Sequence, residues 1–230
     1  MGGGPINLAS KALSGEPLTL RRATKDDLDD ITWIVRDGSP DDPGTDYRFP
    51  YRDKYPADFW KWTRVEYEEY FDRPDKLVVL VVTAPILDDG QTIHQPVSVG
   101  VWDVAVTSDF IPGDHGIDER RDANPTHMRT YIHDLTNGIK KYFRQFGKEQ
   151  IGLGRLVTHP DFRRRGAASM ICEWGQKEAC KDGKSLGLLA TPMGKPLYLS
   201  LGYKVIGKVV AQVEGEEERV EVDAMVKHNK

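Results

Sequence analysis

The sequence LVTHPDFRRRGAAS, residues 156–169, decides the fold of this 230-residue chain. Val157 and Thr158 are β-branched and predict the end of a strand, and the small residues from Gly166 onward predict the opening of a helix of about 166–182. A helix opening directs backbone amides and the positive end of the helix dipole at one point. Phosphate is the natural ligand of such a point. The stretch therefore predicts a phosphate-binding turn between a strand and a helix.

The turn itself follows a recognisable order: an Arg or Gln, two variable residues, Gly, one variable residue, and a Gly or Ala. Small residues at 166 and 168 leave the backbone amides open to a pyrophosphate. A P-loop would need a Gly-Lys-Ser/Thr ending, and a dinucleotide fingerprint would need three glycines, of which only Gly166 is present. A run of three arginines on a solvated surface is the simpler alternative when the turn is taken alone.

Composition bounds the class of protein. The chain is 39% hydrophobic, which suits one domain over 17–230 preceded by a flexible tail over 1–16. A net charge of -4 argues against nucleic acid as a partner, and no apolar run of membrane-spanning length occurs. Cys172 and Cys180 lie about 12 Å apart along one predicted helix, too far for a disulfide. We expect two buried thiols in a reducing, cytoplasmic compartment.

The remaining pattern predicts a mixed α/β (α+β) sheet. The long segment 38–56, rich in Pro and Asp, is predicted to be a loop, and residues 88–95 a turn. The alternation of apolar residues changes phase near Trp102, which predicts a β-bulge. The predicted strands are 18–23, 77–82, 97–106, a strand ending near 158, 186–190, 204–213 and 219–226. The predicted helices begin near 24 and 59, and cover about 126–146, 166–182 and 196–201.

Two segments together resemble the GCN5-related N-acetyltransferase (GNAT) superfamily. One is residues 156–168, and the other is LYLSLGY at 197–203, which is similar to the family's Leu-Tyr-x-x-x-Gly-Phe/Tyr element. The resemblance implies a single domain with about seven mostly antiparallel strands, flanked by helices and splayed between the two central strands. It covers 17–230, with a helical insertion at about 107–146. The aromatic segment 47–71 resembles fungal members of the superfamily.

The resemblance also implies the acyl donor, acetyl-CoA, and a reaction that needs no metal. The strand before the turn would pair with the pantetheine arm, and the turn would hold the pyrophosphate. The implied cofactor-binding residues are Leu156, Val157, Thr158, Arg163, Arg164, Arg165, Gly166, Ala167, Ala168 and Ser169. For Arg164 and Arg165, the side chains could point to solvent while only the amides bind. No metal site is predicted from His115, His127 and His133, whose spacings of 12 and 6 do not share a helical face.

Tyr198 matches the family's general acid, whose phenol donates a proton to the departing sulfur. The alternative is that Tyr198 packs beneath the cofactor. The family's glutamate base is missing, because Gly152 stands at that position. His159 has a suitable intrinsic pKa and is the first candidate base. Other candidates are a water relay or one of Asp103, His133, Asp134 and Glu149.

The function that this resemblance implies is acetyl transfer from the thioester to a primary amine, with a small-molecule amine as the expected partner. One alternative is a protein acetyltransferase acting on lysine or an N-terminal amine. Another is a non-catalytic acyl-CoA-binding protein. We expect neither nucleic acid nor membrane as a partner, and a monomer or homodimer. Neither motif specifies the acceptor amine.

Overall fold

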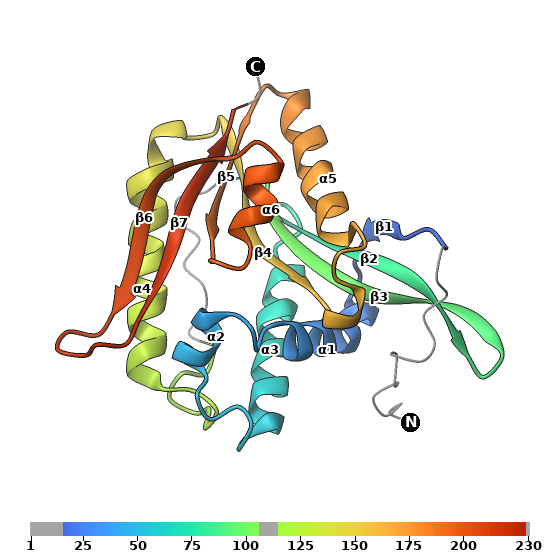
Figure 1. Ribbon diagram of the computed structural model, residues 1–230, viewed down its shortest axis with the longest axis horizontal. Coiled ribbons are helices and arrows are strands. Elements are labelled where there is room, and N and C mark those ends of the chain that lie inside the picture. Colours follow the sequence, from blue (N-terminus) through green and yellow to red (C-terminus); the bar gives the residue numbers. More distant parts are fainter. Residues whose placement is uncertain (1–15, 106–114, 229–230) are drawn as a thin grey trace.

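The computed structural model describes residues 16–105 and 115–228, and its centre is an open seven-stranded sheet (Figure 1). The strand order is β1-β2-β3-β4-β5-β7-β6, and only the β4–β5 pair is parallel. This confirms the predicted mixed, mostly antiparallel sheet. The strands are β1 (Thr19–Arg22), β2 (Leu77–Asp88), β3 (Gln91–Asp103), β4 (Gln150–Thr158), β5 (Ser185–Ala190), β6 (Lys204–Gln212) and β7 (Arg219–Lys227).

The sheet opens between its two central strands. β4 and β5 pair only over Gln150–Leu153 and Ser185–Leu188, although β4 continues to Thr158. On its other side β4 stays paired with β3 as far as Thr158. The register of that pair shifts between Val101 and Trp102, so that Gly154 is an extra residue on β4. Such a bulge bends and twists the strand that carries it. The register shift falls near Trp102 as predicted, but the extra residue is on β4 and not on the predicted strand 97–106, at the point where β4 leaves β5.

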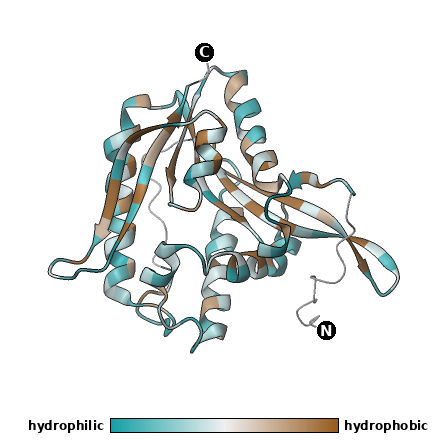
Figure 2. Ribbon diagram, in the orientation of Figure 1, coloured by the Kyte–Doolittle hydropathy of each residue, from teal (hydrophilic) through white to brown (hydrophobic). Residues whose placement is uncertain are grey.

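Helices cover both faces of the sheet. α1 (Leu28–Gly38) and α3 (Pro56–Phe71) share a core with Val79, Val81 and Val99, whereas α5 (Ala167–Lys181) shares a core with Val78 and Leu80. Since alternate residues of a strand point to opposite faces, α5 lies on the face opposite α1 and α3. The apolar bands of the strands are visible in Figure 2.

α4 (Pro125–Phe143) covers the β5–β7 arm on the same face as α1 and α3. A Cβ added to Gly187 of β5 would lie 2.9 Å from the Phe143 ring, while the neighbouring Leu186 and Leu188 belong to the α5 core. α4 also packs along β6, as Figure 1 shows. The helix agrees with the predicted one at 126–146; that the span is an insertion stays a prediction.

Two local predictions are wrong. Residues 38–56 are not one loop, because α2 (Pro43–Arg48) forms within them; Asp42 accepts a hydrogen bond from the Gly44 amide at 2.8 Å and caps the helix. Residues 88–95 are not a turn either. Only Asp89 and Gly90, both with positive φ, turn the chain, and β2 and β3 run up to them. Both corrections reflect local signals, an N-cap followed by Pro and an Asp-Gly pair.

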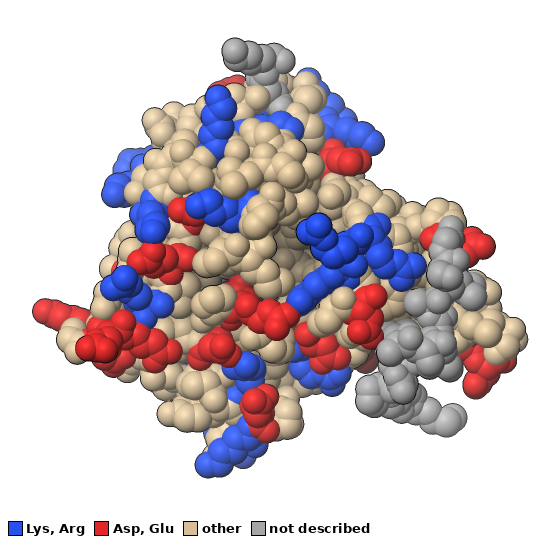
Figure 3. All heavy atoms as spheres, in the orientation of Figure 1, with Lys and Arg blue, Asp and Glu red and all other residues tan. Residues whose placement is uncertain are grey.

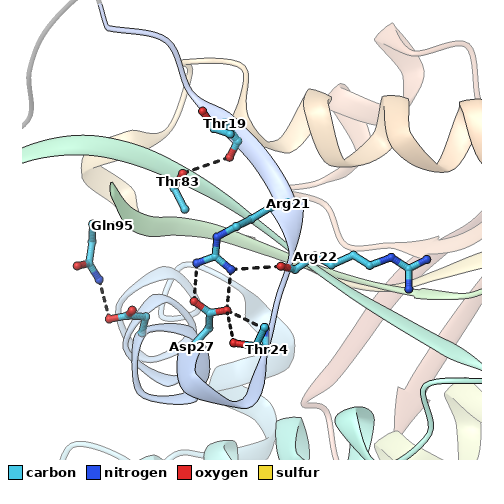
Figure 4. Close-up of polar contacts among 8 residues, drawn as sticks. Thr19, Arg21, Arg22, Thr24, Asp27, Thr83 and Gln95 are labelled. Carbon is cyan, nitrogen blue, oxygen red and sulfur yellow. Dashed lines mark hydrogen bonds and ion pairs between the residues drawn. The ribbon is translucent and has the colours of Figure 1, made fainter. Parts of the chain in front are cut away.

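Polar contacts attach the edge strand β1 to α1 (Figure 4). Arg21 donates to both carboxylate oxygens of Asp27 at 2.8 and 2.6 Å, and the Thr24 amide donates to the same carboxylate. Thr24 and Asp27 form the capping box of the short 3-10 helix η2 (Lys25–Asp27), which leads into α1, so Asp27 joins β1 to this helical segment. Nearby, Gln95 donates to Asp30 at 2.6 Å and so links α1 to β3.

α5 carries both cysteines, and both are free thiols, as their separation predicted. Cys172 is buried, but Cys180 is exposed, so the expectation of two buried thiols is wrong for Cys180. Among the described residues, no helix is both long and apolar enough to cross a membrane. The predicted tail over 1–16 lies outside the described residues except for Glu16.

Candidate active site

The candidate site begins at the free edge of β4. The His159 amide donates to Val97 and the Val157 carbonyl accepts from Ser98, so both backbones turn toward β3. Because backbone groups alternate in direction along a strand, those of Leu156 and Thr158 turn toward the opening. Leu156 and Thr158 are therefore the predicted residues whose backbones lie on the side that β5 has left; Val157 contributes its side chain to the α1–α3 core.

The turn after β4 has an unusual backbone. Arg164 has φ +63° and Gly166 has φ +90°, two left-handed residues within three positions. Alternation of this kind curls successive amides around a concavity that suits an anion. A Cβ added to Gly166 would have no neighbour within 4 Å, so the space beside the turn is open. α5 begins at Ala167, and its hydrogen-bonded ladder starts when the Met170 amide donates to Gly166. The amides that come before Met170 at the start of α5 are those that a helix leaves without an internal hydrogen-bond partner.

The three arginines of the turn play different parts. Arg163 donates to Asp41 at 2.5 Å and to the Gly38 carbonyl at 2.9 Å, and its own amide donates to Pro160. It therefore fastens the turn to the end of α1. Arg165 stacks over Phe162, and Arg164 is exposed. Figure 3 shows Lys and Arg side chains beside a hollow at the centre of this face, with acidic side chains along its lower side.

Tyr198 lies on the short helix α6 (Lys195–Ser200), which follows β5. The side chain is 7% exposed and packs edge-on against Tyr203 in the α5 core. Burial, with Cys172 and Tyr203 nearby, raises the pKa of the Tyr198 phenol well above its ordinary value. The phenol is protonated at neutral pH, as an ordinary tyrosine also is, so it carries a proton to donate.

His159 lies at the end of β4, where its ring stacks on Trp33 at 4.1 Å. Its Nδ1 accepts from the Asp161 amide at 3.3 Å, and its Nε2 lies 3.5 Å from an Asp37 oxygen. Burial lowers the pKa of His159 although Asp161 and Asp37 oppose this. Both ring nitrogens thus have protein partners, and the ring holds the turn against α1.

The remaining base candidates are widely separated. Asp103 pairs directly with Gly152 across the β3–β4 ladder, and a Cβ added to Gly152 would lie 4.0 Å from the Asp103 Cβ. His133 and Asp134 contact each other at 2.9 Å on α4, with His133 72% exposed. Glu149 is exposed just before β4 begins. Only Asp103 places a carboxylate beside the position where the resemblance leads us to expect one.

A polar cluster that sequence reasoning missed lies on the α1–α3 face of β4. Arg155 donates from Nε and a terminal nitrogen to Glu66 of α3, at 2.9 and 2.6 Å, and the Tyr70 hydroxyl donates to the same oxygen. Burial alone would raise the pKa of Glu66, but Arg155, His115 and Tyr70 lower it to about 2. The only signal in the sequence is a charged residue within an otherwise apolar strand.

Comparison with known proteins agrees with this geometry. No family model matches the chain. An acetyltransferase of the fungus Stachybotrys chartarum is 25% identical over 203 residues, which are 86% of this chain and 85% of the relative. Arylalkylamine N-acetyltransferase 2 of Aedes aegypti superposes with a TM-score of 0.60 at 13% identity, covering 93% of this chain and 99% of the mosquito protein.

A second solved structure contains the cofactor. It is the PaiA N-acetyltransferase of Thermoplasma acidophilum in complex with coenzyme A, with a TM-score of 0.50, 12% identity, and coverage of 93% of this chain and all of that one. The fungal relative is an acetyltransferase, and the two solved neighbours, one of them with coenzyme A bound, are N-acetyltransferases with the same fold as this chain. Together with the open sheet and the turn after β4, they show that the chain has the fold of these N-acetyltransferases and is similar in sequence to a fungal acetyltransferase.

Proposed function

We propose that this protein is an acetyl-CoA-dependent N-acetyltransferase that acetylates the primary amine of a small molecule. One observation carries the proposal: β4 leaves β5 after four paired residues, and the free part of β4 leads into a turn with two left-handed residues, Arg164 and Gly166. A buried, protonated tyrosine on α6, directly after β5, supplies a proton donor for the chemistry.

The residues present suit the acyl donor. The backbones of Leu156 and Thr158 can extend hydrogen bonds to the amides of a pantetheine arm, as a further strand would. The amides of Arg164 to Ser169 can hold the pyrophosphate, aided by the dipole of α5. When bound, acetyl-CoA supplies an activated acetyl group as a thioester, together with a thiolate leaving group. Tyr198 then donates its phenolic proton to that sulfur.

The acceptor amine must lose a proton before it attacks, because an alkylamine is mostly protonated at pH 7. We assign this task to Asp103, whose strand position faces Gly152. His159 is the other candidate; its contacts with Trp33, Asp161 and Asp37 favour a structural role. Asp103→Asn should lower kcat most at the acidic end of the pH profile, and adding Gly152→Glu should restore part of the rate. An unchanged profile in Asp103→Asn would remove Asp103 from the mechanism.

The substrate side favours a small molecule over a protein. α2 contacts α4 and β7 of the β5–β7 arm, and only residues 39–42 separate it from α1, which covers the other arm on the same face. The segment from α1 to α2 therefore forms a bridge between the two arms. Such a bridge narrows the approach that a lysine on a folded protein would need. The mosquito neighbour, named for arylalkylamines, supports the same reading.

The test is the release of the free thiol of CoA from acetyl-CoA across a panel of small amines and a lysine-containing peptide. We expect amine-dependent release, and a loss of about 10- to 1,000-fold in Tyr198→Phe. Tyr203→Phe, which removes a neighbouring buried hydroxyl, is the matched control. Release that no amine stimulates would leave a binding protein, and release only with the peptide would make the acceptor a protein.

The phosphate turn has a test of its own. Gly166→Trp should abolish acetyl-CoA binding measured by calorimetry, because a large side chain would fill the open space beside the turn. Gly215→Trp is the control, since Gly215 has φ +85° and also has open space around it, but lies in the β6–β7 turn. Affinity retained in Gly166→Trp would refute the phosphate assignment.

A further inference from the structure

The polar cluster on the α1–α3 face has an excess of guanidinium groups. Glu66 is engaged by Arg155 and Tyr70 through one oxygen. A second guanidinium, that of Arg48 on α2, lies close enough for the charges of both Arg155 and Glu66 to act on it. Two cations therefore share this region with a carboxylate that is already bound to one of them.

Arg48 is held rigidly but lacks an anionic partner. Its Nε donates to the Gly44 carbonyl at 2.8 Å, and its guanidinium lies over the rings of Tyr131 and Phe49 at 4.4 and 4.7 Å. Among the described residues, no carboxylate oxygen lies within 4.0 Å of it and its two terminal nitrogens have no acceptor. Those nitrogens are not sealed inside the protein either. Burial lowers the pKa of Arg48, as expected for a cation that has lost water without gaining an anion.

The position of Arg48 fits the acceptor side of the site. Asp42, the cap of α2, raises the pKa of Arg48 and also that of Tyr198. The start of α2 is therefore near both the proton donor and Arg48. Arg155 belongs to β4 itself, immediately after the bulge residue Gly154. The two guanidiniums thus lie beside the stretch of β4 that leaves β5.

We propose that the acceptor is a primary amine that also carries a carboxylate, and that Arg48 binds this carboxylate beside Arg155. The inference rests on the proposed acetyltransferase function and names its substrate class. A guanidinium presents parallel N–H donors that match a carboxylate. The rings of Tyr131 and Phe49 fix the plane of the guanidinium, so little ordering is needed on binding.

The test compares matched pairs of amines that differ only in the carboxylate. The pairs are phenylalanine with phenethylamine, leucine with isoamylamine, and γ-aminobutyrate with butylamine. We expect at least one acid to exceed its partner by about tenfold or more in kcat/KM. In Arg48→Gln that ratio should fall by about 10- to 100-fold, the range for hydrogen bonds to charged groups. Arg48→Lys keeps the positive charge but not the pair of parallel N–H donors, so its kcat/KM ratio should fall less than that of Arg48→Gln.

Controls and a second readout separate the possible failures. Arg219→Gln removes one positive charge from the β7 surface and should leave the ratios unchanged. Hydrocinnamate, a carboxylate without an amine, should bind the wild-type protein in the presence of CoA by calorimetry and bind Arg48→Gln at least tenfold more weakly. Unfolding curves of each variant check that it folds.

The outcomes are distinguishable. One outcome is that each neutral amine reacts as fast as its carboxylate-bearing partner and that Arg48→Gln leaves the kcat/KM ratios unchanged. This result would overturn the carboxylate subsite and leave the acetyltransferase function intact. Turnover of no amine, with hydrocinnamate binding that depends on Arg48, would support the subsite and refute the enzymatic function. Absence of both turnover and hydrocinnamate binding would refute both.

Discussion

Replacing Glu66 with glutamine should destabilise the protein by about 3 kcal/mol. The pKa of Glu66 is about 2 in the fold against an ordinary 4.5, and each pKa unit corresponds to about 1.4 kcal/mol. The Glu66 side chain is only 16% exposed, so solvent screens this interaction little. An independent estimate agrees, because removing one partner of a buried ion pair costs about 3–5 kcal/mol by leaving the other charge without a counterion.

The pH dependence gives this prediction a second signature. A carboxylate with a depressed pKa contributes its full stabilisation above the unfolded value of 4.5 and loses it as the pH falls toward about 2. The wild-type free energy of unfolding should therefore fall more steeply between these two values than that of Glu66→Gln. Urea titrations at a series of pH values, followed by tryptophan fluorescence, measure both quantities.

Glu68→Gln is the matched control for this experiment. Glu68 lies on the same helix, is 44% exposed and pairs loosely with Arg64 at 3.6 Å, so its loss should cost less than about 1 kcal/mol. If Glu66→Gln cost no more than Glu68→Gln, the buried network would not stabilise the fold. If the free energy of unfolding of Glu66→Gln fell with acidification as steeply as that of the wild type, the depressed pKa of Glu66 would be wrong.

Three further substitutions test other parts of the structure. Asp27→Ala should cost about 1–2 kcal/mol in urea unfolding, because it removes the Arg21 pair and the hydrogen bond from the Thr24 amide, whereas exposed Asp26→Ala should cost less. Gly175→Ala should cost about 1–3 kcal/mol, since its Cβ would lie 2.1 Å from the Trp102 ring, while Gly152→Ala has room for a Cβ. The pKa of His159 lies below its ordinary 6.5, so its stabilising effect is full above pH 6.5 and is lost as the pH falls further. In His159→Gln the free energy of unfolding should therefore fall less steeply below pH 6.5 than in the wild type. The exposed control, His133→Gln, should leave that slope unchanged.

Local patterns predicted most of the fold because the elements that build the sheet carry their own signals. The alternation of β3 predicted the strand, and its phase change at Trp102 predicted the place of the register shift, although the extra residue lies on β4. The Pro- and Asp-rich segment was harder to interpret, because a six-residue helix offers little periodicity and its prolines suggest a loop. Asp42 before Pro43 was the available signal for the start of α2.

The polar cluster could not be found in the same way. Glu66 and Arg155 are 89 positions apart, and neither sits in a motif. Their contact depends on where α3 lies across β4, which only the packed fold determines. The same holds for Arg48, whose helix was not predicted. The proposed cofactor side of the site lies in one continuous stretch of sequence, whereas the proposed acceptor side draws on three distant segments.

This difference follows from what each ligand requires. A pyrophosphate and a pantetheine arm are bound mainly through backbone groups, so a short stretch with small residues can specify them. In our proposal the acceptor is selected by side chains, here those of Arg48 on α2 and Arg155 on β4, with Glu66 of α3 beside them. The base position shows the same logic, because register places Asp103 of β3 opposite Gly152 of β4. A carboxylate can thus reach that place from the neighbouring strand, and its absence from one position of a motif does not by itself argue against catalysis.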